Sequence, residues 1–314
     1  MSKHWRQQRE GGGYFALWLI RTIALYGGRR FARLFLYPIT GYFFLRRHDE
    51  RAASRAFLTR VFGKPPSNKQ ILHHIHWRAA TLLDRIFFLT RGVRGFDIDS
   101  AGVDMLKAHL AAGKGMLLVG SHFGSFEVMR SLAEDHHVPL RIVLNTQQMP
   151  AQSALFAKLA PDLARNIIDG SQDPASTVLA MAEATAQGHV VALLGDRGRP
   201  DETMLRVPFL GAPAPFPIGP WMLATALKVP VIVCYGIYRG GNRYQLIFEH
   251  FADPISVKRE QRAAVLHDLI TAYAERLQHY TRRSPYNWFN FYDFWDDAEA
   301  TETITEHQVE SKST

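Results

Sequence analysis

Apolar residues in this chain form short runs, which are separated by longer stretches with apolar positions every three or four residues. The short runs predict buried strands, and the stretches between them predict amphipathic helices. From about Val103 onward the two patterns alternate along the chain. The predicted strands are Gly115–Val119, Leu140–Leu144, Val190–Leu194, Val229–Tyr235 and a hairpin strand, Arg243–Glu249.

The helical pattern fills the gaps between these runs and also precedes them. Ser67-Asn68 is a typical helix start, and Gly92 is a typical end for the same helix. The predicted helices are Arg51–Phe62, Asn68 to about Arg91, Val103–Ala112, Phe126–Glu134, Ala151–Leu163, Ser176–Gln187, Gly219–Lys228 and Lys258–Thr281. This alternation predicts an α/β fold with a largely parallel mixed sheet flanked by helices.

Two segments near the C-terminal side interrupt the alternation. Val207–Trp221 holds five prolines and almost no charge, which predicts a stiff apolar loop. Such a loop is suited to wall a channel for an apolar chain, or equally to connect two domains. Pro285–Trp295 is strongly aromatic, and the polar residues 298–314 predict a disordered tail.

The N-terminal 60 residues are both basic and apolar. They hold twelve Lys and Arg against three acids, a net charge of +9, whereas the whole chain carries +8. Tyr14–Tyr26 and Phe31–Leu45 are rich in Leu, Phe, Tyr and Ile. We expect residues 1–50 to form a hydrophobic helical membrane segment, either a short span or an amphipathic helix in the interface, with arginines facing anionic headgroups. The alternative is a buried hairpin of two core helices. Interleaved arginine and leucine argue against nucleic-acid binding.

Neither the cysteine nor the clustered histidines predict a metal site. Cys234 is the only cysteine and lies in an apolar run, so we expect a small buried hydrophobe. His73, His74 and His76 share one predicted helix without a nearby acid or thiol. We therefore expect them on a solvated or headgroup-facing helix surface.

The segment GSHFGSFE, residues 120–127, follows a predicted buried strand. In a continuous helix the side chains of His122 and Glu127 would point about 140° apart. Gly124 is the residue that most readily allows the backbone to bend between them. Ligands of parallel sheets bind beyond the carboxyl ends of the strands, and His122 is predicted there. Glu127 falls in the first turn of the next helix, where the dipole favours an acid.

This pair is open to several interpretations. A hydrogen-bonded turn histidine and a dipole-favoured acid account for the spacing without any chemistry. The alternative is a general base with its orienting carboxylate, in which the other ring nitrogen accepts a proton from an attacking group. After the strand Val190–Leu194, Arg197 and Arg199 are predicted at the same edge, where they bind an anionic headgroup or form ion pairs with nearby acids.

Residues 113–127 resemble the signature block of the lysophospholipid acyltransferase superfamily, in the lipid A late (lauroyl/myristoyl) acyltransferase branch. Val207–Gly211, Pro217–Gly219, Trp221–Ala224 and Lys228–Ile232 are similar to further blocks of that branch, so the resemblance covers roughly residues 14–295. The aromatic ending Trp288–Trp295 is closer to acyltransferases of aryl-polyene or other glycolipid pathways.

The resemblance implies a function and assigns residues to it. It implies fatty acyl transfer from an acyl carrier protein or acyl-CoA thioester to a hydroxyl of a lipid or glycolipid, at the cytoplasmic face of a bacterial inner membrane, without a cofactor. His122 would be the general base and Glu127 its orienter. Phe123, Gly124, Ser125, Arg197 and Arg199 would contact substrate, with an oxyanion near the Gly124 and Ser125 amides.

The same residues leave two other classes of function open. A thioesterase or esterase would use water in place of the lipid acceptor, and a non-catalytic lipid-binding protein would need no base at all. The predicted division is a membrane-associating segment over 1–50, an acyltransferase domain over 51–297 and the tail over 298–314.

Overall fold

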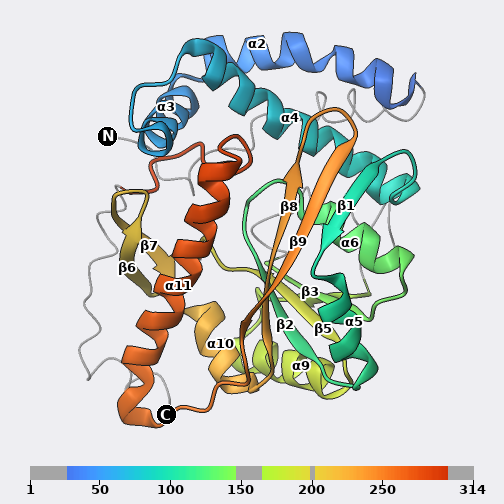
Figure 1. The fold of residues 1–314 in the computed structure, drawn as a ribbon, viewed down its shortest axis with the longest axis vertical. Coiled ribbons are helices and arrows are strands. Elements are labelled where there is room, and N and C mark those ends of the chain that lie inside the picture. Colours follow the sequence, from blue (N-terminus) through green and yellow to red (C-terminus); the bar gives the residue numbers. More distant parts are fainter. Residues whose placement is uncertain (1–26, 146–164, 199–201, 296–314) are drawn as a thin grey trace. The chain divides into compact units, whose positions relative to one another are not determined.

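The computed structural model describes residues 27–145, 165–198 and 202–295, and the chain divides into two units (Figure 1). The sheet unit comprises Phe87–Asp196 and Pro220–Val257. The helical unit comprises the residues up to Ile86, Arg197–Gly219 and the residues from Lys258 onward. The predicted helix Ala151–Leu163, the apolar stretch Tyr14–Tyr26 and the polar tail lie outside the described residues. The predicted division at residues 50 and 297 stays a prediction.

The sheet unit is built on seven strands in the order β1-β9-β8-β2-β5-β3-β4 within the described residues (Figure 1). Neighbouring strands are parallel, except for the antiparallel pair β8 and β9. The strands are β1 Asp97–Ala101, β2 Met116–Gly120, β3 Leu140–Leu144, β4 Ile167–Asp169, β5 Val190–Leu194, β8 Val231–Tyr238 and β9 Arg243–Ala252. The prediction of a largely parallel mixed sheet is confirmed.

Helices flank this sheet as the alternating pattern predicts. Helix α6 packs against β3, β8 and β9, and α9 packs against β4 and β5. The bounds are α5 Val103–Ala111, α6 Phe126–Asp135, α9 Pro174–Ala186 and α10 Gly219–Leu227. Strands β2 and β8 are buried along their whole length, which is why continuous apolar runs encode them.

The helical unit contains most of the long helices. Residues 27–34 are helical, and they are followed by α2 Leu36–Arg46, α3 His48–Phe62 and α4 Asn68–Arg91, of which the residues from Phe87 belong to the sheet unit. After the short helix η2 Arg259–Gln261 comes α11 Arg262–Arg283. Helix α4 begins with a capping box, in which the Ser67 amide donates to Gln70 Oε1 at 2.8 Å and the Gln70 amide donates to Ser67 Oγ at 3.3 Å. It ends before Gly92, whose φ is +61°. Both predicted ends of this helix are confirmed.

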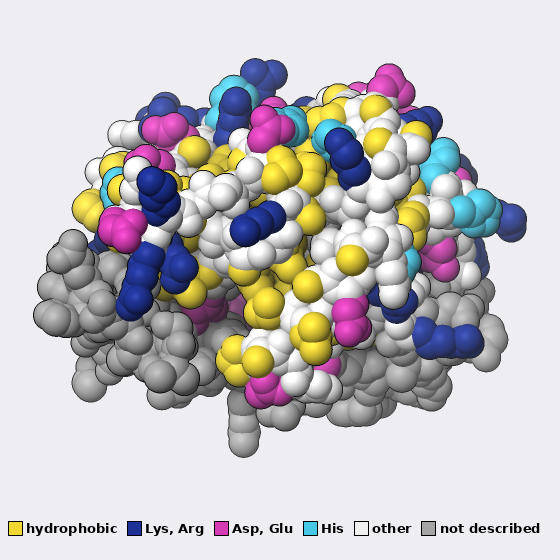
Figure 2. All heavy atoms as spheres, turned by 90° about the horizontal axis from the view of Figure 1, so that it is seen from below, with side chains coloured by type: hydrophobic (Ala, Val, Ile, Leu, Met, Phe, Trp, Pro, Cys, Tyr) yellow, Lys and Arg dark blue, Asp and Glu magenta, His cyan; other side chains and the backbone are white. Residues whose placement is uncertain are grey.

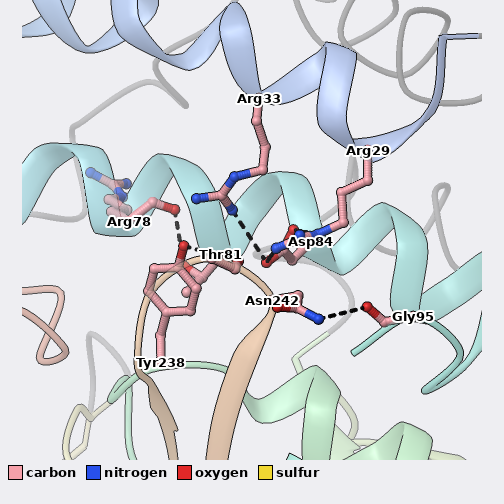
Figure 3. A network of polar contacts seen from close by, with 9 residues as sticks. Arg29, Arg33, Arg78, Thr81, Asp84, Gly95, Tyr238 and Asn242 are labelled. Carbon is pink, nitrogen blue, oxygen red and sulfur yellow. Dashed lines mark hydrogen bonds and ion pairs between the residues drawn. The ribbon is translucent and has the colours of Figure 1, made fainter. Parts of the chain in front are cut away.

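The helix at residues 27–34 turns charged side chains inward. Arg29 donates two hydrogen bonds, of 2.7 and 2.8 Å, to the carboxylate of Asp84 on α4, and Arg33 lies 3.9 Å from the same carboxylate (Figure 3). Asp84 is fully buried, so this pairing keeps its charge compensated. The apolar side chains of Phe31 and Leu34 are exposed instead, at 50% and 60%.

The proline-rich segment was predicted as a loop, and that prediction is wrong. Strands β6 Met204–Phe209 and β7 Ala212–Pro217 form an antiparallel hairpin, in which Pro208 lies opposite Pro213. The connecting residues Leu210 and Gly211 have φ of +50° and +86°, as in the tight turns that match strand twist. In a two-stranded sheet each strand has one unpaired edge. A proline whose nitrogen faces that edge removes no hydrogen bond between strands. Helix α11 packs against β6.

Among the described residues, no helix combines the length and apolarity needed to cross a bilayer. The expected membrane segment therefore gains no support from a spanning helix in this part of the chain. Residues 27–46 nevertheless expose much apolar surface, from Phe31, Leu34, Phe35, Tyr37, Tyr42 and Leu45.

Candidate active site

The parallel pairing of β2 with β5 brings two chain segments together at one edge of the sheet. Gly120 of β2 is in register with Leu194 of β5, and the Gly195 amide donates to the Gly120 carbonyl at 2.9 Å. The residues that follow, Ser121-His122 and Gly195-Asp196, therefore leave the sheet side by side. This is the carboxyl edge at which ligands of parallel sheets bind.

His122 and Asp196 form the central contact of this edge. The Nδ1 atom of His122 lies 2.9 Å from Oδ1 of Asp196. The His122 backbone N–H also donates to both carboxylate oxygens, at 3.1 Å each. Asp196 is fully buried, whereas the His122 side chain is 36% exposed. The aspartate is therefore fixed inside the protein, while the imidazole reaches solvent.

This contact determines which ring nitrogen of His122 is able to act as a base. An ionised carboxylate only accepts hydrogen bonds, so Nδ1 carries the hydrogen in its contact with Asp196. In the neutral ring the lone pair is then on Nε2. A buried negative charge at Nδ1 also stabilises the imidazolium that forms when Nε2 accepts a proton. The pair thus has the arrangement of a general base and its orienting acid.

The bend predicted at Gly124 is confirmed. Its φ is +64°, a conformation in which other residues are strained. Gly124 forms a parallel bridge with Gly236 of β8, and the Ser125 amide donates to the Gly236 carbonyl at 2.8 Å. A Cβ atom at Gly236 would lie 2.2 Å from the Ser125 carbonyl oxygen, so this close approach requires glycine. The turn is thereby tied to the sheet directly after His122.

Glu127 lies in the first turn of α6, as the sequence predicts, and is 3% exposed. Its Oε2 atom accepts a hydrogen bond from Arg130 Nε at 3.0 Å. Arg130 also contacts Glu134 at 2.6 Å and the Phe88 carbonyl at 3.2 Å. The structure thus places Glu127 in a buried ion pair, and its role as the orienter of His122 stays a prediction.

The sequence interpretation missed Asp196 as a partner of His122. It considered this residue only as an ion-pair partner for neighbouring arginines. The available signal was positional, since Asp196 follows the predicted strand Val190–Leu194 by two residues and His122 follows the predicted strand Gly115–Val119 by three. Recognising it required the knowledge that these two strands are neighbours in the sheet.

The predicted substrate-contacting residues have different environments. Phe123 is 2% exposed, and its ring packs edge-on against Tyr235 with centroids 5.8 Å apart. The Ser125 amide is engaged by Gly236, which leaves the Gly124 amide as the candidate oxyanion donor. Arg197 belongs to the helical unit, where it donates to the Phe289 carbonyl at 2.8 Å and lies over the Tyr292 ring. Arg199 lies outside the described residues. Contact of these residues with substrate stays a prediction.

The histidines of α4 do not share one solvated surface, so that prediction is wrong for His74. This side chain is fully buried, with Nδ1 at 2.8 Å from Ser54 Oγ and Nε2 at 3.0 Å from the Trp288 carbonyl. Burial lowers the pKa of His74 to about 3. His73 is exposed and stacks on Tyr286, whereas His76 is partly buried.

Cys234 is buried, as predicted, and burial raises the pKa of its thiol to about 12. In the ranges that the structure describes, no three His, Cys, Asp or Glu residues are grouped so that they would hold a metal ion.

Basic side chains are not gathered into one area on the face drawn in Figure 2. Lysine and arginine are spread there among hydrophobic and acidic side chains of the described residues. The described residues on this face therefore form no extended basic patch.

Comparison with known proteins gives a match over most of the chain. Residues 1–295 match the model of a family described as bacterial lipid A biosynthesis acyltransferase. No curated protein matches the sequence.

Proposed function

Since the chain belongs to the bacterial lipid A biosynthesis acyltransferase family, we propose that His122 and Asp196 form the catalytic pair of an acyltransferase acting on a lipid hydroxyl. The observation that carries this proposal is the 2.9 Å contact between an accessible imidazole and a fully buried carboxylate. The donor is a fatty acyl thioester on an acyl carrier protein or coenzyme A. The acceptor is a lipid A precursor or a related glycolipid.

The proposed reaction passes one proton through Nε2 of His122. Nε2 takes the proton of the acceptor hydroxyl as its oxygen attacks the thioester carbonyl carbon. The tetrahedral oxyanion accepts a hydrogen bond from the Gly124 amide. When the intermediate collapses, the C–S bond breaks, and the leaving sulfur takes the proton from Nε2 and departs as a thiol. Asp196 keeps its charge throughout and stabilises the transient imidazolium.

The described N-terminal helices support the proposal that the enzyme acts at a lipid surface. The apolar side chains of Leu34, Tyr37 and Leu45 are at least 60% exposed, and basic residues accompany them in the same segment. A helix that lies in the interface buries apolar side chains among lipid tails and places arginines at anionic headgroups. We propose that this segment rests on the cytoplasmic face of the bacterial inner membrane.

The experiment follows acyl transfer by the full chain in detergent micelles. Radiolabelled acyl thioesters of carrier protein and of coenzyme A are supplied with lipid A precursors or glycolipid extracts. The wild type is expected to produce acylated lipid, and His122→Ala to reduce the rate by 10²–10⁴-fold, the usual contribution of a general base. His267→Ala, at a histidine 54% exposed on α11, is the matched control.

The products also discriminate among the alternative functions. Release of free fatty acid without acylated lipid, whatever acceptor is supplied, would identify a thioesterase. Full activity in folded His122→Ala would overturn the proposed base. Lipid binding without turnover by the wild type would indicate a non-catalytic lipid-binding protein.

A further inference from the structure

Helix α3 borders a groove of about 1030 Å³. Arginines and small or apolar side chains line it together, chiefly Arg51, Arg55 and Arg60 with Phe44, Ala52 and Ala56. We call it the α3 groove. It lies within the helical unit, and neither His122 nor Asp196 lines it. Its volume matches that of pockets that hold small organic molecules.

The helical spacing of α3 places Arg51 and Arg55 on one face, whereas Arg60, nine residues after Arg51, leaves the helix on another side. Arg51 and Arg55 are four residues apart and therefore lie on adjacent turns of the same face. Arg60 also lines the groove. No acid is among the described residues that line the groove. The groove therefore has a strong positive potential.

The arginines are held in place by neutral groups. Arg51 donates to the Phe44 carbonyl at 2.8 Å, and Arg55 donates to Asn68 Oδ1 at 3.0 Å. Arg60 lies 4.5 Å above the ring of Trp295. Within the described chain none of the three has a carboxylate partner. Among the residues that the structure describes, their charges are thus oriented and have no acid beside them, which is the arrangement that binds phosphate well.

The remaining lining is part apolar, from Phe44, Ala52 and Ala56, and part polar, from His48, Thr59 and Asn68. Ala52 and Ala56 are exposed on α3, and Phe44 comes from α2. A ligand with a phosphate at one end and a hydrocarbon chain at the other would satisfy both parts of the groove. A hydrophilic anion would leave the apolar lining in contact with water.

The exposed side chains of helix α2 indicate that such a ligand is a lipid. The helix that supplies Phe44 also exposes Tyr37, Tyr42 and Leu45, at 69%, 56% and 65%. Exposed apolar side chains of this size favour contact with lipid over contact with water. We propose that the α3 groove binds the phosphate end of an anionic lipid, with the lipid chain along Phe44, Ala52 and Ala56.

The test measures binding and makes no use of acyl transfer, so it is independent of the proposed catalytic pair. Dihexanoyl phosphatidic acid, below its micelle concentration, is titrated by calorimetry into the full chain in a nonionic detergent. Dihexanoylglycerol, which lacks the phosphate, and inorganic phosphate are titrated separately. The wild type is expected to bind phosphatidic acid at least about tenfold more tightly than either comparison compound.

Two variants disturb the groove in different ways. The double variant Arg51→Gln/Arg55→Gln removes the charges, and Ala56→Trp fills the space from an exposed helix position without deleting a contact. Each is expected to weaken phosphatidic acid binding by at least about tenfold. Arg282→Gln/Arg283→Gln removes two exposed arginines from α11 and is expected to bind as the wild type does.

Three results would overturn the proposal. The first is unchanged binding of phosphatidic acid in folded Ala56→Trp, which stays informative if the arginine variant does not fold. The second is equal binding of dihexanoylglycerol, which would show that the phosphate is not recognised. The third is equal binding of inorganic phosphate, which would identify a site for free phosphate in place of lipid.

Discussion

His122 and His74 are two histidines with two opposite environments. At His74 both ring nitrogens contact neutral groups, the Ser54 hydroxyl and the Trp288 carbonyl, and the ring is fully buried. At His122 one nitrogen contacts a buried carboxylate, and 36% of the side chain is exposed. The carbonyl of Trp288 requires a hydrogen on Nε2 of His74, whereas Asp196 requires one on Nδ1 of His122. The environment of His74 disfavours a second proton on the ring, whereas the carboxylate beside His122 stabilises one.

The largest expected effect comes from neutralising the carboxylate. Asp196→Asn removes the charge that stabilises imidazolium at His122, and its amide is able to donate to Nδ1 and so to protect the lone pair there. We expect kcat to fall about 10⁴-fold while the fold is retained, as for the equivalent change in a serine protease triad. Steady-state rates and their pH profile are the measurement.

A second histidine–aspartate pair provides the control for that change. Asp253 contacts His250 at 3.2 Å, but its side chain is 90% exposed. Asp253→Asn should leave kcat unchanged. Equal rates for Asp196→Asn and wild type would remove Asp196 from the catalytic pair.

The next effect separates Asp196 from Glu127, the acid that the sequence singles out. Glu127→Gln weakens a buried pair with Arg130, so we expect a loss of about 3 kcal/mol in the free energy of unfolding. Denaturant titration measures it. Glu134→Gln, at a side chain 64% exposed, is the control and should cost less than about 1 kcal/mol. Abolished transfer in stably folded Glu127→Gln, with an active Asp196→Asn, would instead make Glu127 the orienter.

The smallest effect concerns pH and His74. Its pKa is near 6.5 in the unfolded chain and about 3 in the fold, so only the unfolded state takes up the proton between these values. Stability is therefore complete above pH 6.5 and decreases as the pH falls towards 3. From pH 7 to 5 the contribution is about 2 kcal/mol. Urea unfolding at both pH values should show this loss in the wild type, whereas His74→Gln should lack it. An identical loss in both proteins would contradict the assignment.

How far the sequence predicts the fold depends on burial. The strands β2, β3 and β5 appear as apolar runs and were predicted within a residue or two. Strand β1, with sequence DIDSA, is mostly exposed and lies at a sheet edge, so no apolar pattern marks it. In the β6–β7 hairpin, prolines mask the strand signal because their usual effect is to exclude ladder positions.

At the candidate site, too, the sequence predicts only part of the structure, namely the features formed by neighbouring residues. His122, the bend at Gly124 and the helical start at Glu127 are local features, and eight consecutive residues predict them. Asp196 is 74 positions from His122, and Trp288 is 214 positions from His74. Contacts at such separations depend on strand order and packing, which periodicity does not report.

The double use of Asp196 has a practical consequence. Its carboxylate accepts the His122 backbone N–H as well as the ring nitrogen, so the acid keeps a donor when the imidazole is removed. An inert His122→Ala chain should therefore retain the backbone geometry of the site. Such a chain is suited to trap the intact thioester donor with its acceptor, and mass spectrometry of the captured pair would reveal both natural substrates at once.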